Sequence, residues 1–192
     1  MDVIKIEGGH PITGEVTVEG AKNSALKLMA ATIMAPGVTT LRNVPNIADV
    51  HIMGKVLKCL GATIEVVDAH ELRIDTTDVD KWETPYSLVA QMRASTAVLG
   101  PLISRFGKAV VAMPGGCNIG ARKIDMHILG LEALGVKFEI DHGDIHASTP
   151  EGLHGDTVTL GQPIDSSFHR AAVSFHDPTS QRSGRLHRHL LT

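Results

Sequence analysis

The segment from Pro114 to Arg122 holds the residue types best suited to chemistry in this sequence. It reads Pro-Gly-Gly-Cys-Asn-Ile-Gly-Ala-Arg and places Cys117 in a glycine-rich loop ahead of an expected helix start. Free backbone N–H groups at a helix N-terminus, together with the Arg122 guanidinium, favour the thiolate form of a nearby cysteine. A lone cysteine can instead be an inert buried hydrophobe, but a loop flanked by glycines gives it little to pack against. We therefore expect Cys117 to be a reactive thiol.

Cations recur at three expected helix starts, at Lys22, Arg93 and Arg122. A helix N-terminus presents unpaired N–H groups and a partial positive charge, so an adjacent cation makes it a potential anion site. Each cation taken alone is also typical of solvated surface. Three of them in equivalent places of a repeated unit favour a phosphate-rich ligand.

The remaining candidate groups favour neither a metal site nor a disulfide framework. Asp125 and His127 lie two residues apart, so a helix would not place them on one face, and we expect no metal. Cys59 falls on an expected helix over residues 46–59, one turn from Val56, where a core position is the expectation. The two cysteines of the chain could pair, but free thiols in a reducing compartment are more typical of so small a number.

Composition restricts the classes of protein to which the chain can belong. With 192 residues, 43% hydrophobic and 20% charged, it is long enough for one globular domain or slightly more. A net charge of -3 and only one Trp, one Tyr and four Phe argue against a basic nucleic-acid surface with stacking aromatics. No apolar run reaches the roughly 18 residues of a membrane span, and the first residues lack a signal peptide's apolar stretch. We expect a cytoplasmic protein that binds neither nucleic acid nor membranes.

An internal duplication sets out the elements that must position the reactive groups. Periodicity predicts a helix, a strand, a second helix and two strands, over residues 23–34, 38–41, 46–59, 62–67 and 71–74. The same order recurs about 75 residues further on, over residues 93–103, 108–112, 123–134, 136–140 and 144–147. The segments that begin at Asp49 and Asp125 support this register, because each reads Asp-x-His-Ile. We predict two mixed helix-strand units that bury their apolar faces together.

Both ends of the chain differ from this repeated middle. Residues 3–18 alternate apolar and polar side chains around turn signals, as two short strands would. Residues 168–192 contain four His, four Arg and one acidic residue, with no sustained helical or strand period. We expect this end of the chain to diverge from the repeated design.

The motifs are specific enough to indicate a family. In chain order they are Gly20-Ala21-Lys22-Asn23, Met92-Arg93-Ala94-Ser95 and Pro114-Gly115-Gly116-Cys117-x-Ile119-Gly120-x-Arg122-x-x-Asp125-x-His127. With this order and spacing, residues 1 to about 160 resemble the UDP-N-acetylglucosamine enolpyruvyl transferase family. The related enolpyruvyl transferases of the shikimate pathway share the architecture but are not expected to carry this cysteine loop.

The resemblance implies an α/β (α+β) fold, the inverse α/β barrel or alpha-beta prism. Such a fold is built from repeated βαβαββ units, with helices inside and sheets outside, and the family has six units in two lobes. This chain would hold about two and a fraction of them. Residues 1–21 would be strands that pack in the second lobe, residues 22–160 an incomplete first lobe, and residues 161–192 a divergent, disordered tail.

The activity implied by the resemblance is transfer of enolpyruvyl from phosphoenolpyruvate to the 3-hydroxyl of UDP-N-acetylglucosamine, with release of phosphate. This is the first committed step of peptidoglycan synthesis, and it serves cell-wall biogenesis, cell shape and cell division. The reaction needs a proton delivered to the methylene carbon of phosphoenolpyruvate and cations around its phosphate and carboxylate. No cofactor is implied. Fosfomycin, which alkylates the family's cysteine, is expected to modify Cys117.

The family pattern assigns roles to individual residues. Cys117 is the expected proton donor and can also attack phosphoenolpyruvate to give a covalent adduct. Lys22, Asn23 and Arg122 are expected to hold phosphoenolpyruvate, and Lys22 and Arg122 count as catalytic together with Cys117. The residues expected to contact UDP-N-acetylglucosamine are Asn23, Arg93, Arg122, Lys123, Ile124, Asp125 and Met126.

Other functions stay open at this point. The family's second lobe supplies a catalytic aspartate and a further arginine that have no counterpart in these 192 residues. A frameshifted or prematurely ended reading frame would produce a divergent tail such as residues 161–192. One lobe cannot close over the substrates and exclude water, so we expect that this chain does not complete the reaction alone. The alternatives are a catalytically inactive fragment or a residual nucleotide-sugar or anion-binding module. A thiol redox protein would require Cys59 to pair with Cys117.

Overall fold

Two units of the same design make up the described part of the chain. The computed structural model describes residues 3–156, except 6, 10, 12, 90–91 and 114–123. The expected tail, residues 161–192, and the glycine-rich loop around Cys117 lie outside the described residues. Within the described part, no helix combines the length and the apolar character that crossing a membrane requires.

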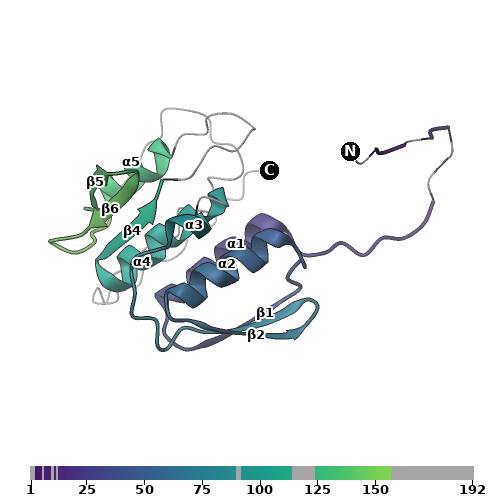
Figure 1. Ribbon diagram of the computed structural model, residues 1–192, viewed down its shortest axis with the longest axis horizontal. Helices are drawn as coiled ribbons and strands as arrows, with labels where there is room; N and C mark the ends of the chain where they lie inside the picture. The colour runs from purple at the N-terminus through teal and green to yellow at the C-terminus, as the bar shows by residue number, and fades with distance from the viewer. Residues whose placement is uncertain are drawn as a thin grey trace.

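The first unit is a three-stranded antiparallel sheet with helices packed on it (Figure 1). Its elements, in chain order, are α1 (Lys22–Ala31), the 3-10 helix η1 (Thr32–Met34), β1 (Val38–Arg42), α2 (Ala48–Cys59), β2 (Thr63–Asp68) and β3 (Glu71–Asp75). The strand order is β1-β3-β2, so β3 is central and β1 and β2 form the edges.

The second unit repeats this plan with additions before its sheet. Its elements, in chain order, are α3 (Tyr86–Val89), the 3-10 helix η2 (Arg93–Val98), α4 (Leu99–Phe106), β4 (Lys108–Ala112), α5 (Asp125–Ala133), β5 (Lys137–Asp141) and β6 (Asp144–Ser148). The strand order β4-β6-β5 matches that of the first sheet. Glu83 forms a parallel bridge to Val110 on the outer edge of β4. With this bridge in the place of a first strand, the second unit follows the βαβαββ order.

Equivalent hydrogen bonds confirm the predicted duplication. The backbone N–H of Thr76 donates to the Gly37 carbonyl at 3.0 Å, and that of Thr149 donates to the Gly107 carbonyl at 2.8 Å. Both threonine side chains also donate to the same carbonyls, at 3.3 and 3.1 Å. The second helix of each unit ends in the same way, because Gly61 and the equivalent glycine of the second unit both have positive φ angles that favour glycine.

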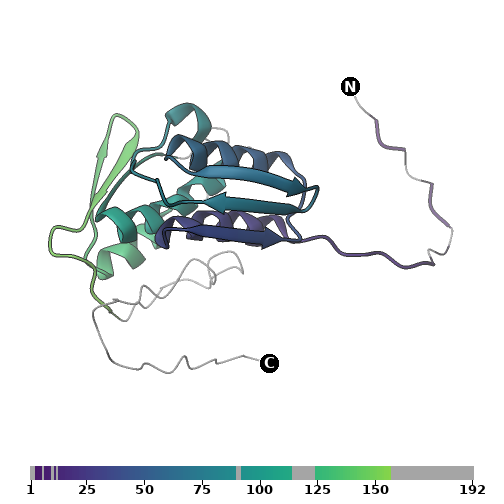
Figure 2. The same ribbon diagram turned by 90° about the horizontal axis from the view of Figure 1, so that it is seen from below.

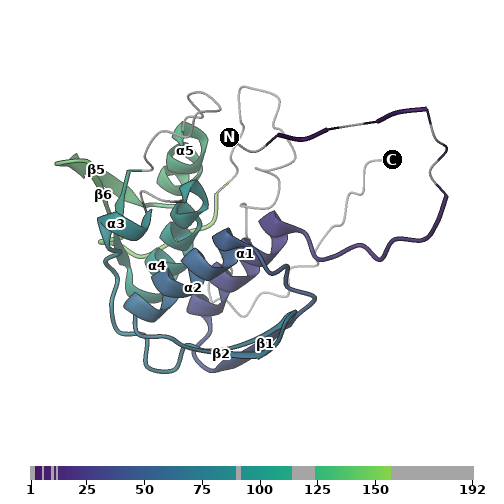
Figure 3. The ribbon, with the colours of Figure 1, turned by 45° about the vertical axis from the view of Figure 1, so that its right-hand side comes forward.

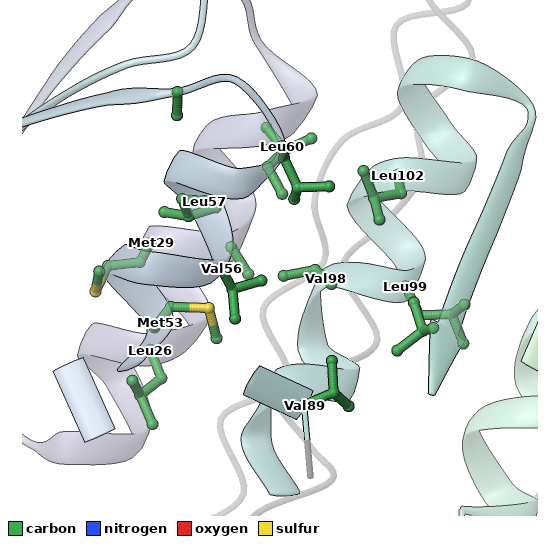
Figure 4. Packing of buried hydrophobic residues seen from close by; sticks show 14 of the residues in the cluster. Leu26, Met29, Met53, Val56, Leu57, Leu60, Val89, Val98, Leu99 and Leu102 are labelled. Carbon is green, nitrogen blue, oxygen red and sulfur yellow. The ribbon is translucent and has the colours of Figure 1, made fainter. Parts of the chain in front are cut away.

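The hydrophobic core lies where α1 and α2 meet the segment from α3 to α4. Apolar residues recur at helical spacing along α1 and α2, and those that face the second unit are buried. In Figures 1 and 3 the helices gather in the middle, and the two sheets lie toward the outside. Figure 4 shows the side chains that meet in this core, among them Leu26, Met29, Met53, Val56, Val98, Leu99 and Leu102.

Arg105 fastens the second unit to the first. Its guanidinium donates hydrogen bonds to the carbonyl oxygens of Ile33, Thr76 and Thr77, at 3.1, 2.9 and 3.3 Å. Arg105 lies in the last turn of α4, and Ile33 lies in η1, directly after α1. The C-terminal ends of the two helical segments are therefore adjacent. Because η2 also contacts α1 while α4 contacts η1, α1–η1 runs in the same direction as η2–α4.

The helix expected over residues 93–103 is divided into η2 and α4 in the structure. Pro101 lies in the first turn of α4, where its lack of an N–H group is tolerated. A proline at this position is therefore compatible with a helix that begins at Leu99, directly after η2.

The two short strands expected over residues 3–18 are not formed by the described residues there. These residues, 3–5, 7–9, 11 and 13–19, are called the N-terminal arm below. All of them are exposed, and none is paired in a sheet. An alternating pattern becomes a strand only when another strand pairs with it, and the arm extends away from both sheets (Figure 2).

Candidate functional site at the helix N-termini

The start of α1 is held against the end of β1. Gly20 donates its backbone N–H to the Asn43 side-chain oxygen at 3.1 Å, and a Cβ at Gly20 would overlap the Asn43 carbonyl oxygen. Glycine is therefore required for this close approach. Ala21 follows with an extended backbone and serves as the N-cap of α1, so Lys22 becomes the first helical residue.

Lys22 is paired with an acidic residue of the neighbouring helix. Its Nζ lies 2.9 Å from Oδ2 of Asp49, which sits in the first turn of α2. The Lys22 side chain is 54% exposed and that of Asp49 is 33% exposed. An ion pair so open to solvent contributes at most about 1 kcal/mol to stability. Its main effect is to hold the ammonium group between the N-termini of two helices.

Arg93, the first residue of η2, lies at the same end of the molecule as Lys22. η2 packs against α1, and the shared direction of α1–η1 and η2–α4 puts their first residues together. β4 then leads back from the C-terminal end of α4 toward the start of η2. β4 therefore ends near the starts of α1 and η2, and the described chain stops at Met113, directly before the glycine-rich loop.

The described residues contain only part of the expected site. Lys22 and Asn23 lie in the first turn of α1, and both are exposed. Ile124 is the N-cap of α5, and the backbone places Asp125 and Met126 in the first turn of that helix. The other expected site residues, Cys117, Arg122 and Lys123, lie outside the described residues.

This end of the molecule suits an anionic group. The first N–H groups of α1 have no partner within the helix and carry part of the helix dipole, and Lys22 adds a full positive charge. Phosphate is the kind of ligand that such helix ends bind. Asp49 opposes this attraction, because its carboxylate lies beside the same ammonium group. The described residues hold no group of three His, Cys, Asp or Glu side chains that could bind a metal ion.

Asp49 is the residue that sequence reasoning missed. In the sequence it stands out only as part of the repeated Asp-x-His-Ile segment, although an acidic residue in a first helical turn is a typical signal of a helix start. Nothing in the sequence indicates that it would meet Lys22, because that contact depends on how α1 packs beside α2.

The expectation that Cys59 lies in the core is wrong. Cys59 is exposed at the last position of α2. The buried face of α2 runs through Met53, Val56 and Leu57, and a residue two positions after Leu57 is rotated to the solvent side. The groove beside it is lined by Lys58, Cys59, Asp80, Lys81, Trp82, Glu83, Thr84 and Pro85.

A family model matches most of the chain. The model described as EPSP synthase (3-phosphoshikimate 1-carboxyvinyltransferase) matches residues 6–174. This range includes both repeated units and the glycine-rich loop.

Curated relatives are similar over a comparable share of the chain. A UDP-N-acetylglucosamine 1-carboxyvinyltransferase of Saccharophagus degradans is 45% identical over 166 residues, which are 84% of this chain and 40% of the relative. Proteins of the same name from Cellvibrio japonicus and Trichlorobacter lovleyi are 46% and 48% identical over 166 and 162 residues. The alignments span 40% and 38% of those two relatives. The chain thus spans about two fifths of the length of the curated relatives it matches.

Solved structures confirm the expected fold class. The enolpyruvyl transferase NikO from Streptomyces tendae matches with a TM-score of 0.62 and 24% identity, over 76% of this chain and 32% of that chain. EPSP synthase from Acinetobacter baumannii matches with a TM-score of 0.60 and 15% identity, over 82% of this chain and 36% of that chain. At such low sequence identity, these similarities support the fold alone.

Proposed function

The chain belongs to the EPSP synthase (3-phosphoshikimate 1-carboxyvinyltransferase) family, and on this premise we propose that it is part of an enolpyruvyl transferase that acts on UDP-N-acetylglucosamine. The observation that carries the proposal is the similarity of the chain, over most of its length, to proteins named UDP-N-acetylglucosamine 1-carboxyvinyltransferase. The proposed reaction joins the enolpyruvyl group of phosphoenolpyruvate to the 3-hydroxyl of the sugar and releases phosphate. It would begin peptidoglycan synthesis in the cytoplasm and so serve cell shape and division.

Lys22, Asn23 and Arg122 are the proposed binding residues for phosphoenolpyruvate. The position of Lys22 supports this role, because its ammonium group lies at the N-terminus of α1, where a phosphate or carboxylate is stabilised. Asn23 is exposed in the same turn, so its side-chain amide is free to donate toward the ligand's oxygens. Positive charge at this place would stabilise the negative charge that phosphoenolpyruvate carries through the reaction.

Cys117 is the proposed proton donor. Addition of the sugar hydroxyl forms a bond from its oxygen to C2 of phosphoenolpyruvate, while the hydroxyl's own proton passes to a base and another proton enters the methylene carbon. Loss of a proton from that carbon, with cleavage of the C2–O bond to phosphate, restores the double bond in the product. A thiol close to the methylene carbon can deliver the proton that enters this carbon. It can instead add across the double bond, with its sulfur bonded to C2 and a proton on the methylene carbon, to give a covalent adduct.

The proposed contacts to UDP-N-acetylglucosamine come from three helix starts. Asn23 lies at the start of α1 and Arg93 at the start of η2, which packs against α1. The remaining contacts would come from the segment that leads into α5, namely Arg122, Lys123, Ile124, Asp125 and Met126. A diphosphate placed among these helix N-termini would be stabilised by their N–H groups.

The division of the chain into parts is likewise a proposal. Residues 1–21 would pack in a second lobe, residues 22–160 would form the incomplete first lobe, and residues 161–192 would be a divergent tail. Catalysis by closure needs both lobes around the substrates. We therefore propose that the 192-residue chain alone does not turn over, and that its residual property is binding of a nucleotide sugar or another anion.

Labelling with fosfomycin tests the identity of the site. Intact-mass and peptide mass spectrometry of the treated chain should show one adduct, on Cys117. The Cys117→Ala variant should remain unlabelled, whereas the matched Cys59→Ala variant should be labelled as the parent is, because Cys59 lies at the last position of α2 and has no role in the proposed site. Labelling of Cys59 alone, or of neither cysteine, would contradict the proposed role of Cys117.

Two solution measurements separate the transferase from the binding module. Calorimetric titration with UDP-N-acetylglucosamine reports binding, and a coupled phosphate assay with both substrates reports turnover. Binding without phosphate release is the expected result for the isolated chain. Phosphate release that disappears in the Cys117→Ala variant would instead show that these 192 residues suffice for catalysis. Absence of binding would contradict both functions.

A further inference from the structure

The two sheets differ at one edge. In the second unit the outer edge of β4 is covered by the segment around Glu83, which runs parallel to it. Thr84 donates its N–H to the Val110 carbonyl at 3.0 Å, and Val110 donates its N–H to the Trp82 carbonyl at 2.9 Å. In the first unit β1 is the corresponding strand, and no described residue pairs with its outer edge.

The hydrogen-bonding groups on the free edge are arranged as they are in β4. The Gly37 carbonyl accepts the Thr76 N–H just as the Gly107 carbonyl accepts the Thr149 N–H. Hydrogen-bonded positions therefore alternate in the same way along β1 and β4. Thr40 therefore corresponds to Val110. Its N–H and carbonyl point away from β3, as those of Val110 point away from β6. β1 thus presents the same donor and acceptor that the Glu83 segment satisfies in the second unit.

The burial of residues in β1 and β4 shows which side chains a strand on the free edge of β1 would cover. Ala109 and Val111, which flank Val110 and face the helices, are 1% and 0% exposed. The equivalent residues Thr39 and Leu41 are only half-buried. The inner face of β1 is therefore more open to solvent than that of β4, as expected of a strand with one uncovered side.

The N-terminal arm has the pattern that this edge requires. Val16 and Val18 are 88% and 83% exposed, and they alternate with polar residues. In the second unit Trp82 and Thr84 lie on the same face as Ala109 and Val111, because side chains alternate along a strand. With Thr17 opposite Thr40, both valines would face the half-buried inner side of β1.

Chain length and one hydrogen bond give the same register. Val110 follows Glu83 by 27 positions, and Thr40 follows Thr17 by 23. The difference equals the single turn α3, Tyr86–Val89, which has 4 residues and no counterpart before α1. Pairing of Thr17 with Thr40 would also bring Gly20 opposite Asn43, and these two residues are already joined by the Gly20 N–H to Asn43 Oδ1 hydrogen bond.

We propose that residues 14–19 of this chain dock on the free edge of β1 as a parallel strand, with Thr17 opposite Thr40, and complete a βαβ unit with α1. A parallel strand needs a crossover helix, and α1 supplies it. The arm is anchored at Gly20 beside the end of β1, so docking within one chain requires only a reversal at residues 19–20. Docking on a second copy would bring two Gly20 residues to the same place. The inference stands apart from the proposed transferase activity and concerns the 192-residue chain by itself. In a protein that also has the second lobe, residues 1–21 would pack there, as proposed above.

Amide hydrogen exchange of the full chain tests this docking. Thr40 should exchange slowly, at least about tenfold more slowly than in a chain whose arm cannot pair, because its N–H would donate to the Val16 carbonyl. Leu41 serves as the internal reference, since its N–H points into the β1–β3 ladder in either case. A fast Thr40 amide contradicts the proposal, whatever the exchange rate of Leu41.

Two proline variants form a matched pair. Val18→Pro removes the N–H that would donate to the Thr40 carbonyl, whereas Thr17→Pro removes an N–H that would face away from β1. Both restrict the arm to a similar extent. Docking as proposed predicts rapid Thr40 exchange in Val18→Pro and slow exchange in Thr17→Pro. Equal effects of the two prolines would overturn the proposed register.

Concentration separates this proposal from strand exchange between copies. Docking within one chain predicts the same Thr40 exchange rate over a hundredfold dilution and a monomer by sedimentation. Protection that is lost on dilution, together with a dimer at high concentration, would assign the arm to a second copy and overturn the proposal.

Discussion

Lys22 and Asp49 begin neighbouring helices and form an ion pair, with 2.9 Å between Nζ and Oδ2. The pair places opposite charges at a point where the N–H groups of α1 also attract anions. An incoming phosphate would therefore compete with the Asp49 carboxylate for the Lys22 ammonium group.

Removing the Asp49 charge should strengthen anion binding. In Asp49→Asn the shape is kept, while a repulsion of about 1 kcal/mol on a nearby anion is lost, equivalent to roughly fivefold tighter binding at low salt. Calorimetry with phosphoenolpyruvate in the presence of UDP-N-acetylglucosamine measures the change, and Lys22→Gln is the control that should lose affinity. If Asp49→Asn weakened binding as much as Lys22→Gln does, Asp49 would instead be needed to position Lys22.

Gly20 should tolerate no side chain. A Cβ there would overlap the Asn43 carbonyl oxygen, so Gly20→Ala must displace the start of α1 from the end of β1. We expect the free energy of unfolding in urea to fall by about 1–3 kcal/mol. Gly8→Ala is the matched control, because no atom lies within 4 Å of its added Cβ, and its effect should stay within about 0.5 kcal/mol. Similar effects of the two alanines would show that the Gly20 approach is not rigid.

Arg105 should be important for the attachment of the second unit. Arg105→Met keeps much of the side chain's length but removes the donors to the Ile33, Thr76 and Thr77 carbonyls. Loss of hydrogen bonds from a charged group predicts destabilisation by about 2–3 kcal/mol. Arg42→Met is the control, since the exposed ion pair of Arg42 with Glu71 is worth at most about 1 kcal/mol. Chemical unfolding of both variants measures the difference, and equal losses would contradict this role.

Asp75 should make the stability of the first unit dependent on pH. Hydrogen bonds from the Thr77 hydroxyl and backbone N–H, at 2.6 and 2.9 Å, lower the pKa of Asp75 below its ordinary value of 3.8. A carboxylate with a lowered pKa stabilises the fold above its unfolded-state pKa, and this contribution disappears as the pH falls through the folded-state pKa. The stability difference between the parent and Asp75→Asn should therefore shrink from pH 6 to below the folded-state pKa of Asp75. Unfolding curves that keep a constant difference would show that the hydrogen bonds do not favour the ionised form.

Much of the fold could be predicted from the sequence because its signals are local. Helical spacing and glycine stops identify α1, α2 and α5 and the β2–β3 and β5–β6 hairpins, and the Asp-x-His-Ile repeat relates the two units. The three cations at expected helix starts can likewise be identified from the sequence. In the structure the starts of α1 and η2 lie at one end of the molecule. These features depend on neighbours within a few positions along the chain.

Tertiary structure alone decided which distant groups meet. Lys22 finds Asp49 only because α1 packs beside α2, and Cys59 is exposed because the buried face of α2 turns away from it. The alternation of Val16 and Val18 resembles that of a strand, yet the arm remains unpaired in the structure, while the short segment at Glu83 does pair with β4. Strand formation depends on hydrogen bonds to a partner far away in sequence, and a local pattern cannot specify whether that partner is present.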